Sequence, residues 1–243
     1  MSGHSKWSTI KHKKGALDAK RGKLWTKILK EITVAARMGG GDLNSNPRLR
    51  LAVDTGKAAN LPKENYERAI KKGTGELEGV TYEEITYEAY APGGAAIIIE
   101  ALTDNKNRTT PEVRSYFAKF SGDLGAQGSV AYLFSREGQI VVEPEVAEDK
   151  VMEVALEAGA EDVAMDGGAW VIKTSPESYE GVKKAVESAG LPVIEAKLIM
   201  APSTSVALEG SKLTSFLKLV DLLEDNDDVQ HVWHNAVYDE PED

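Results

Sequence analysis

The sequence predicts an α+β protein with an N-terminal three-helix domain followed by two ferredoxin-like α+β domains, one inserted in the other. Helical periodicity dominates the chain up to residue 78, whereas strands and helices alternate from residue 79 onward. Residues 138–201 also follow the order β-α-β-β-α-β, which is typical of a ferredoxin-like domain. A chain of 243 residues is long enough for two or three such domains.

The chain opens with a polar stretch, residues 1–18, in which no periodicity is sustained. Because this stretch is rich in Lys and Gly, we expect an extended basic arm. A helical domain should follow over residues 19–78. Its first helix, residues 19–38, has an apolar face composed of Leu24, Trp25, Ile28, Leu29, Ile32, Ala35 and Ala36.

Capping residues predict two more helices in this domain. The glycines at 39–41 would end the first helix, and Asn46-Pro47 is a favourable N-cap and first-turn pair for a second helix reaching about residue 59. Pro62 would open the third helix, and the glycine-rich residues 73–75 would close it. The three helices share one apolar side, so we expect them to pack together.

Strands and turns predict the start of a second domain after residue 79. Strands over 82–91 and 95–102 should be joined by a turn at Pro92-Gly93-Gly94. A helix should start at Thr109 or Thr110 with Pro111, and residues 129–134 should form a further strand.

The end of the chain, a helix over 212–224 and a strand over 229–235, has no partner of its own. These two elements would complete the second domain. We therefore expect a discontinuous α+β domain of residues 79–135 plus 204–243, into which a ferredoxin-like domain of residues 136–203 is inserted. The elements expected in the inserted domain are strand 139–142, helix 147–158, strands 162–165 and 169–173, helix 177–189 and strand 193–200.

Charge divides the chain unevenly. The first 72 residues carry 17 Lys and Arg against 6 Asp and Glu, a net charge of +11, whereas the remaining 171 residues have a net charge of −21. A basic head on an acidic body indicates that the head meets a polyanion, although a solvated charged helix would give a similar count. For the acidic body, contact with a protein partner, dimerisation or orientation of the head is expected.

The cations of the head form an arm and a cationic stripe that lies opposite the apolar face of the first helix. The stripe consists of Lys20, Lys23, Lys27, Lys30 and Arg37. Lys and Arg that neutralise phosphates release counterions, which makes this pattern typical of nucleic-acid binding. Trp7 could stack on an unpaired base, whereas Trp25 belongs to the apolar face. A membrane surface is a weaker candidate because the arm has no apolar face. The candidate nucleic-acid-binding residues are Lys6, Trp7, Lys11, Lys13, Lys14, Lys20, Arg21, Lys23, Lys27, Lys30, Arg37, Arg48 and Arg50.

Catalytic, metal and cofactor motifs are scarce. The absence of Cys excludes thiol catalysis and thiolate-ligated metals, and the glycine clusters lack a phosphate-loop pattern. The acidic run at 225–228 lacks the ligand spacing of a calcium loop. We therefore expect no metal, no cofactor and no small-molecule substrate. The polar loop 103–108 remains a possible functional loop through Asp104, Asn105, Asn107 and Arg108, with a helix cap as the alternative.

Several blocks of the chain resemble the YebC/PmpR family. They are Met1 to Trp7, Ile10 to Gly15, Asp18 to Gly22, Glu31 to Arg37 with the glycines that follow, Asn46 to Arg50, Glu67 to Gly75, Pro92 to Gly94 and Thr103 to Asn105. Ala89 and Ala91 depart from the pattern, in which glycines are expected. The resemblance implies one helical domain and two α+β domains. It also implies a function in gene expression, because members of this family are described as DNA-binding transcriptional regulators and its relatives include a mitochondrial translational activator.

Three functions follow as hypotheses. The leading one is a cytoplasmic, non-enzymatic, DNA-binding transcriptional regulator. The alternative is a translation factor that binds ribosomal RNA. An enzyme that uses the 103–108 loop is the third. DNA and ribosomal RNA call for the same basic head, because lysines contact backbones rather than base edges.

Overall fold

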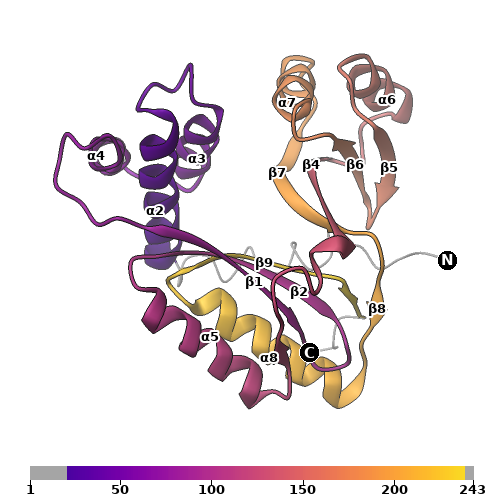
Figure 1. The fold of residues 1–243 in the computed structure, drawn as a ribbon. Helices are drawn as coiled ribbons and strands as arrows, with labels where there is room; N and C mark the ends of the chain where they lie inside the picture. Colours follow the sequence, from indigo (N-terminus) through magenta and orange to yellow (C-terminus); the bar gives the residue numbers. More distant parts are fainter. Residues whose placement is uncertain (1–20, 239–243) are drawn as a thin grey trace. The chain divides into compact units, whose positions relative to one another are not determined.

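The computed structural model describes residues 21–238, and the chain divides into two compact units. The described part of one unit contains residues 21–129 and 210–232, and that of the other contains residues 130–209 and 233–238. Figure 1 shows the elements of both units along the chain. The predicted arm of residues 1–18 lies outside the described residues.

The helical part of the first unit consists of α2 (Arg21–Gly39), α3 (Pro47–Ala58) and α4 (Lys63–Thr74). Asn46 caps α3 as predicted, because its side chain accepts from Leu49 N at 3.0 Å. The same side chain donates to the carbonyl oxygens of Ala35 and Gly40, both at 2.8 Å, which holds the end of α2 to the start of α3. The core between the helices is built from Ile28, Ile32, Ala35, Ala36, Leu49, Ala52, Val53, Leu61 and Ala69.

A close approach of α4 to α2 depends on Gly73. A Cβ at this position would overlap the carbonyl oxygen of Thr33 and would lie 2.8 Å from Ala36 Cβ. Real Cβ atoms do not approach so closely, so only glycine lets the two helix backbones meet here.

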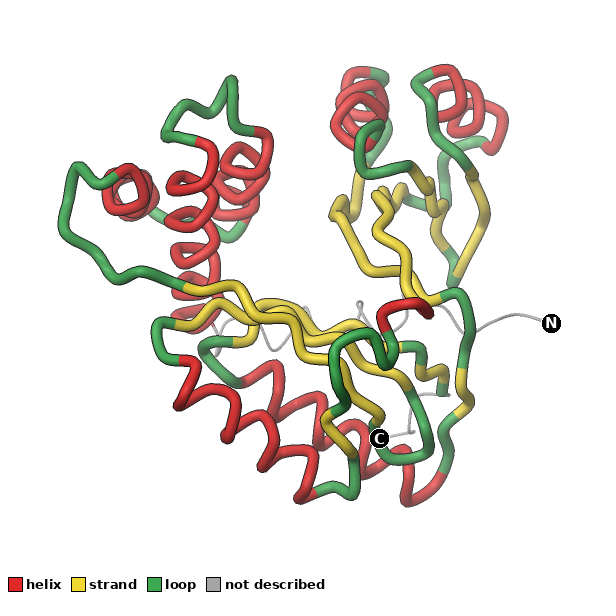
Figure 2. Tube along the Cα trace, in the orientation of Figure 1, coloured by secondary structure: helices red, strands yellow, loops and turns green. Residues whose placement is uncertain are grey.

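The α+β part of the first unit is a four-stranded sheet with the order β3-β1-β2-β9. Its strands are β1 (Glu83–Tyr90), β2 (Ala96–Thr103), β3 (Asp123–Leu124) and β9 (Val229–His234). Two helices, α5 (Lys106–Lys119) and α8 (Gly210–Asp225), lie on the same face of this sheet (Figure 2). The C-terminal helix and strand therefore complete the sheet that begins at β1.

Two predicted element boundaries are wrong. Helix α5 starts at Lys106 rather than at Thr109 or Thr110, because Asn105 caps it by accepting from Arg108 N at 3.2 Å. Pro111 consequently lies inside the helix. The predicted strand 129–134 is a short 3-10 helix over Ala131–Leu133, and strand β4 begins only at Phe134.

The inserted unit has the ferredoxin-like order β4-α6-β5-β6-α7-β7, and its sheet has the order β5-β6-β4-β7. All of its strand pairs are antiparallel. The elements are β4 (Phe134–Val142), α6 (Glu148–Glu157), β5 (Asp162–Asp166), β6 (Ala169–Thr174), α7 (Tyr179–Ser188) and β7 (Val193–Pro202). Two short strands, β8 (Val206–Ala207) and β10 (Ala236–Val237), pair in parallel.

The predicted fold class is confirmed: helices come first, and one α+β domain is inserted in another. The residue boundaries proposed for the three domains stay a prediction. In the structure the helices α2–α4 belong to the same compact unit as the sheet β3-β1-β2-β9. The contacts that join these two parts can therefore be described.

We predict that Gly73→Ala lowers the free energy of unfolding by about 1–3 kcal/mol, because the added methyl group forces α4 away from α2. Gly22→Ala in α2 is the matched control, since a Cβ there meets no atom within 4 Å. Urea unfolding of both variants measures the difference. Equal stability of the two variants would contradict the close-approach argument.

Candidate functional site

The lysine stripe of α2 contacts another segment of the first unit. We define the lysine stripe as Lys23, Lys27 and Lys30, which share one face of the helix because they are spaced i, i+4 and i+7. All three donate to residues 224–228, here called the acidic turn, at the junction of α8 and β9. Both segments belong to the same compact unit.

The two outer lysines bind the C-terminal end of α8. Lys23 Nζ lies 2.8 Å from Asp225 Oδ2 and donates to the Asp225 carbonyl oxygen at 3.0 Å. This hydrogen bond to the Asp225 side chain raises the pKa of Lys23. Lys27 Nζ donates to the Glu224 carbonyl oxygen at 2.6 Å, and burial lowers its pKa against the attraction of Glu224. Both lysines thus satisfy carbonyl groups that a helix end leaves unpaired.

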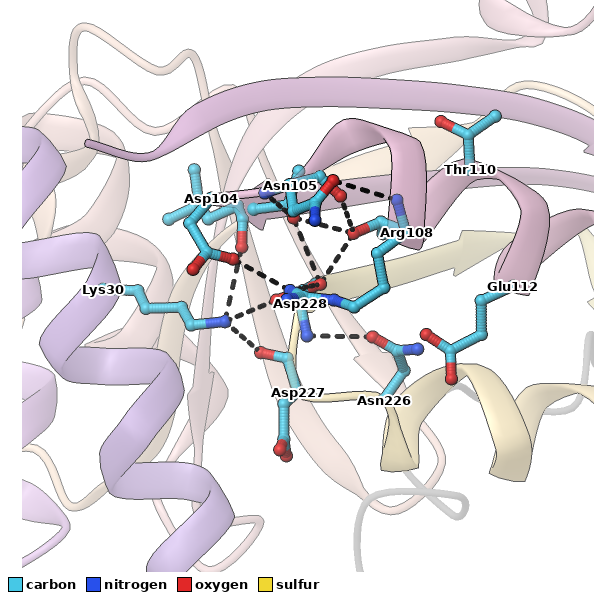
Figure 3. Close-up of polar contacts among 12 residues, drawn as sticks. Lys30, Asp104, Asn105, Arg108, Thr110, Glu112, Asn226, Asp227 and Asp228 are labelled. Atoms are coloured by element: carbon cyan, nitrogen blue, oxygen red, sulfur yellow. Dashed lines mark hydrogen bonds and ion pairs between the residues drawn. The ribbon is translucent and has the colours of Figure 1, made fainter. Parts of the chain in front are cut away.

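The inner lysine forms a buried ion pair. Lys30 Nζ lies 2.7 Å from Asp228 Oδ1 and donates to the Asp227 carbonyl oxygen at 2.8 Å. The side chains of Lys30 and Asp228 are only 10% and 5% exposed. Figure 3 shows the pair between α2 and the acidic turn. A buried charge is tolerated only when it is paired and hydrogen-bonded, so this contact fixes both segments.

Asp228 also accepts hydrogen bonds from the end of β2 and the start of α5. Its Oδ2 accepts from Arg108 Nη2 at 2.6 Å and from Thr109 Oγ1 at 2.7 Å, with Thr103 Oγ1 at 3.2 Å. Burial alone would raise the pKa of Asp228, but the hydrogen bonds from Arg108, Lys30 and Thr109 lower it to about 2. The carboxylate therefore stays charged, and it ties three segments of the chain together.

The acidic turn explains why the stripe is needed. Acidic residues at a helix C-terminus oppose the helix dipole, which favours cations there. The last turn of α8 contains no basic residue, although Glu224 and Asp225 close the helix. The lysines of α2 supply the missing cations. An acidic helix end without a basic residue is the sequence pattern that indicates a need for cations from elsewhere in the chain.

The sequence places Lys30 in the cationic stripe opposite the apolar face of α2, but in the structure Lys30 is buried. Arg48 and Arg50 are also engaged within the protein. Arg48 pairs with Glu31, Nε to Oε1 at 2.6 Å, and with Glu84. Arg50 Nη1 donates to the Leu43 carbonyl oxygen at 2.9 Å. These contacts stabilise the helical part and join it to β1.

Two other described candidates, Arg21 and Arg37, are exposed. The remaining candidates are Lys6, Trp7, Lys11, Lys13, Lys14 and Lys20, and they lie outside the described residues.

The possible functional loop has a structural explanation. Asn105 is the N-cap of α5, and Asp104 pairs with Arg108 at 2.9 Å. Arg108 also binds Asp228, and Asn107 is exposed. Asn105 thus caps a helix, and Arg108, which is paired with Asp104, holds the acidic turn.

Among residues 21–238, no group of three or more His, Asp or Glu is arranged to hold a metal ion. Within the same residues, no helix is both long and apolar enough to span a membrane.

Comparisons with known proteins cover nearly the whole chain. The family model described as TACO1/YebC protein N-terminal domain matches residues 5–76, and the model of the TACO1/YebC second and third domain matches residues 82–236. A "probable transcriptional regulatory protein" of Geobacter sulfurreducens is 57% identical over 235 residues, which are 97% of this chain and 95% of that protein. A protein of the same name from Desulforapulum autotrophicum is 58% identical over 237 residues, with coverages of 97% and 96%.

A solved structure is similar as well. The crystal structure of a conserved hypothetical protein from Aquifex aeolicus has a TM-score of 0.85 to this chain at 48% sequence identity. The match covers 96% of each chain, so it includes both compact units.

We predict that Asp228→Asn lowers the free energy of unfolding by about 3 kcal/mol, because the buried ammonium group of Lys30 loses its counter-charge. Asp227→Asn is the matched control. The side chain of Asp227 is exposed, and Lys30 contacts this residue through its main-chain carbonyl oxygen, which the variant retains. Chemical unfolding at neutral pH measures both. A loss of the same size in the two variants would refute the role given to Asp228.

A second prediction concerns acid. The pKa of Asp228 is lowered from 3.8 to about 2 in the folded protein, so its contribution to stability is present above pH 4. That contribution should be lost as the pH falls from about 4 to about 2. The free energy of unfolding, measured at several pH values across this window, should therefore fall more steeply for the wild type than for Asp228→Asn. An equal pH dependence in the two proteins would show that the fold does not hold the carboxylate in its charged form.

Proposed function

The chain belongs to the TACO1/YebC family, and from this premise we propose that it is a non-enzymatic transcriptional regulator that binds DNA in the cytoplasm. Relatives that are more than half identical over nearly their whole length carry the name of probable transcriptional regulatory proteins. The observation that carries DNA binding is the net charge of +11 in the first 72 residues. A polyanion is the partner that such a concentration of cations favours.

The structure narrows which cations the proposal can use. Lys30, Arg48 and Arg50 hold the protein together and are assigned structural roles. Lys23 and Lys27 lie at the rim of the acidic turn, and Arg21 and Arg37 are exposed. The other cations of the first 72 residues are five before α2 and five at Lys57, Lys63, Arg68, Lys71 and Lys72, of which Lys57 and Lys63 form ion pairs with Asp54 and Glu67. We assign the main phosphate contacts to the five before α2, because they include the densest group of lysines, at residues 11–14. These residues are Lys6, Lys11, Lys13, Lys14 and Lys20, with stacking by Trp7.

The acidic body has a complementary role in this proposal. Its net charge of −21 repels a phosphate backbone, so DNA contact is confined to the N-terminal region. The acidic turn orients the helical part through Asp228. The surfaces of the two α+β domains are then available to protein partners of the transcription apparatus.

We predict that replacing Lys6, Lys11, Lys13 and Lys14 together by Glu lowers the affinity for duplex DNA at least about tenfold. The slope of log affinity against log salt should fall by about three to four, roughly one for each lost phosphate contact. The matched control replaces four exposed lysines of α6, α7 and α8 by Glu, namely Lys150, Lys184, Lys212 and Lys218, and so changes the net charge equally. Fluorescence anisotropy over a range of salt concentrations measures both quantities. Unchanged affinity and slope in the N-terminal variant would contradict the assignment.

The cellular target can be identified directly. Crosslinking in cells, purification of the protein and sequencing of the attached nucleic acid should enrich promoter DNA. Enrichment of ribosomal RNA, together with co-sedimentation on ribosomes, would overturn the proposal in favour of a translation factor.

A further inference from the structure

We propose that the acidic turn competes with DNA phosphates for Lys23 and Lys27 and thereby restrains DNA binding by α2. This inference rests on the proposed function and adds a regulatory contact to it. The turn and a DNA backbone present the same chemistry to a lysine, namely negatively polarised oxygens within hydrogen-bonding distance. Of the three N–H donors of each ammonium group, Lys23 directs donors at two oxygens of Asp225, and Lys27 directs one at the carbonyl oxygen of Glu224.

The contacts become more accessible from the inner to the outer end of the stripe. The Lys30–Asp228 pair is nearly buried, whereas the side chains of Lys23 and Asp225 are 45% and 49% exposed. An exposed ion pair contributes little to stability, so a polyanion at high local concentration can replace it. The inner pair shares its carboxylate with Arg108 and Thr109 and remains closed. Lys27 lies between the two, because its hydrogen bond to Glu224 is half-buried. A phosphate therefore displaces the contact of Lys23 most readily and that of Lys27 next.

This arrangement links DNA binding to the end of α8. Lys23 and Lys27 donate to the carbonyl oxygens of Asp225 and Glu224 when the contact is closed. When Lys23 and Lys27 bind a phosphate instead, the C-terminal end of α8 loses these two cations. The last turn of the helix is then less stable. By linkage, anything that neutralises the turn must strengthen DNA binding, and DNA binding must loosen the turn.

The test compares two variants of the full chain that change the net charge equally. Asp225→Asn removes the carboxylate that holds Lys23, whereas Asp221→Asn removes an exposed carboxylate one turn earlier on α8. The probe is a short fluorescein-labelled DNA duplex at low ionic strength. We expect Asp225→Asn to bind about threefold more tightly than the wild type, as loss of an exposed ion pair allows, and Asp221→Asn to bind as the wild type does.

A third variant tests whether the effect of Asp225 acts through Lys23 and Lys27. When both lysines are replaced by Gln, the further change Asp225→Asn should no longer raise the affinity for the DNA duplex. A gain that persists in this background, or an equal gain in both Asp variants, would overturn the competition and leave a general charge effect. Wild-type binding with no gain in Asp225→Asn would also overturn it, while leaving the proposed function intact. Failure of every variant to bind DNA would reject the proposed function itself.

Hydrogen exchange gives an independent readout. On addition of the same duplex to the wild type, amides over residues 223–226 should exchange faster, because the end of α8 loses its contacts with Lys23 and Lys27. Protection that is unchanged or increased in this segment would contradict the proposal, even if the affinities of the variants agreed with it.

Discussion

The ion pair between Lys30 and Asp228 is the interaction on which the arrangement of the first unit depends. It joins a helix near the start of the chain to a turn almost two hundred residues later. Both partners are nearly buried, and each has further hydrogen bonds that make burial tolerable. The pair thus specifies how the helical part meets the sheet β3-β1-β2-β9, whose strands are contributed by both ends of the discontinuous domain.

This contact changes the meaning of the charge division along the chain. The basic head of the sequence indicates binding to an external polyanion. In the structure, however, some of these cations bind acidic residues of the same chain. Lys23, Lys27 and Lys30 neutralise the acidic C-terminal end of α8, which has no cation in its own last turn. The cations that remain for a partner include the five lysines before α2, to which we assign the main phosphate contacts.

The sequence was sufficient for the fold class because local patterns determine local structure. The apolar stripe predicted α2, Asn46-Pro47 predicted the start of α3, and alternating strands and helices predicted the inserted domain. Asn105 was a better cap than the residues beside Pro111, so the start of α5 was misplaced. The partner of Lys30 could not be predicted, since a helical period shows which residues share a face but not which distant segment covers it. Only the acidic end of α8 pointed to a missing cation.

A double-mutant cycle between Lys30→Met and Asp228→Asn tests the central claim most directly. The free energies of unfolding of the wild type, both single variants and the double variant give the interaction between the two side chains. If the buried pair holds the helical part to the acidic turn, the coupling should reach about 2 kcal/mol or more, and the double variant should be less damaged than the sum of the single variants. Effects that add to within about 0.5 kcal/mol would show that the two side chains act independently, which contradicts this account.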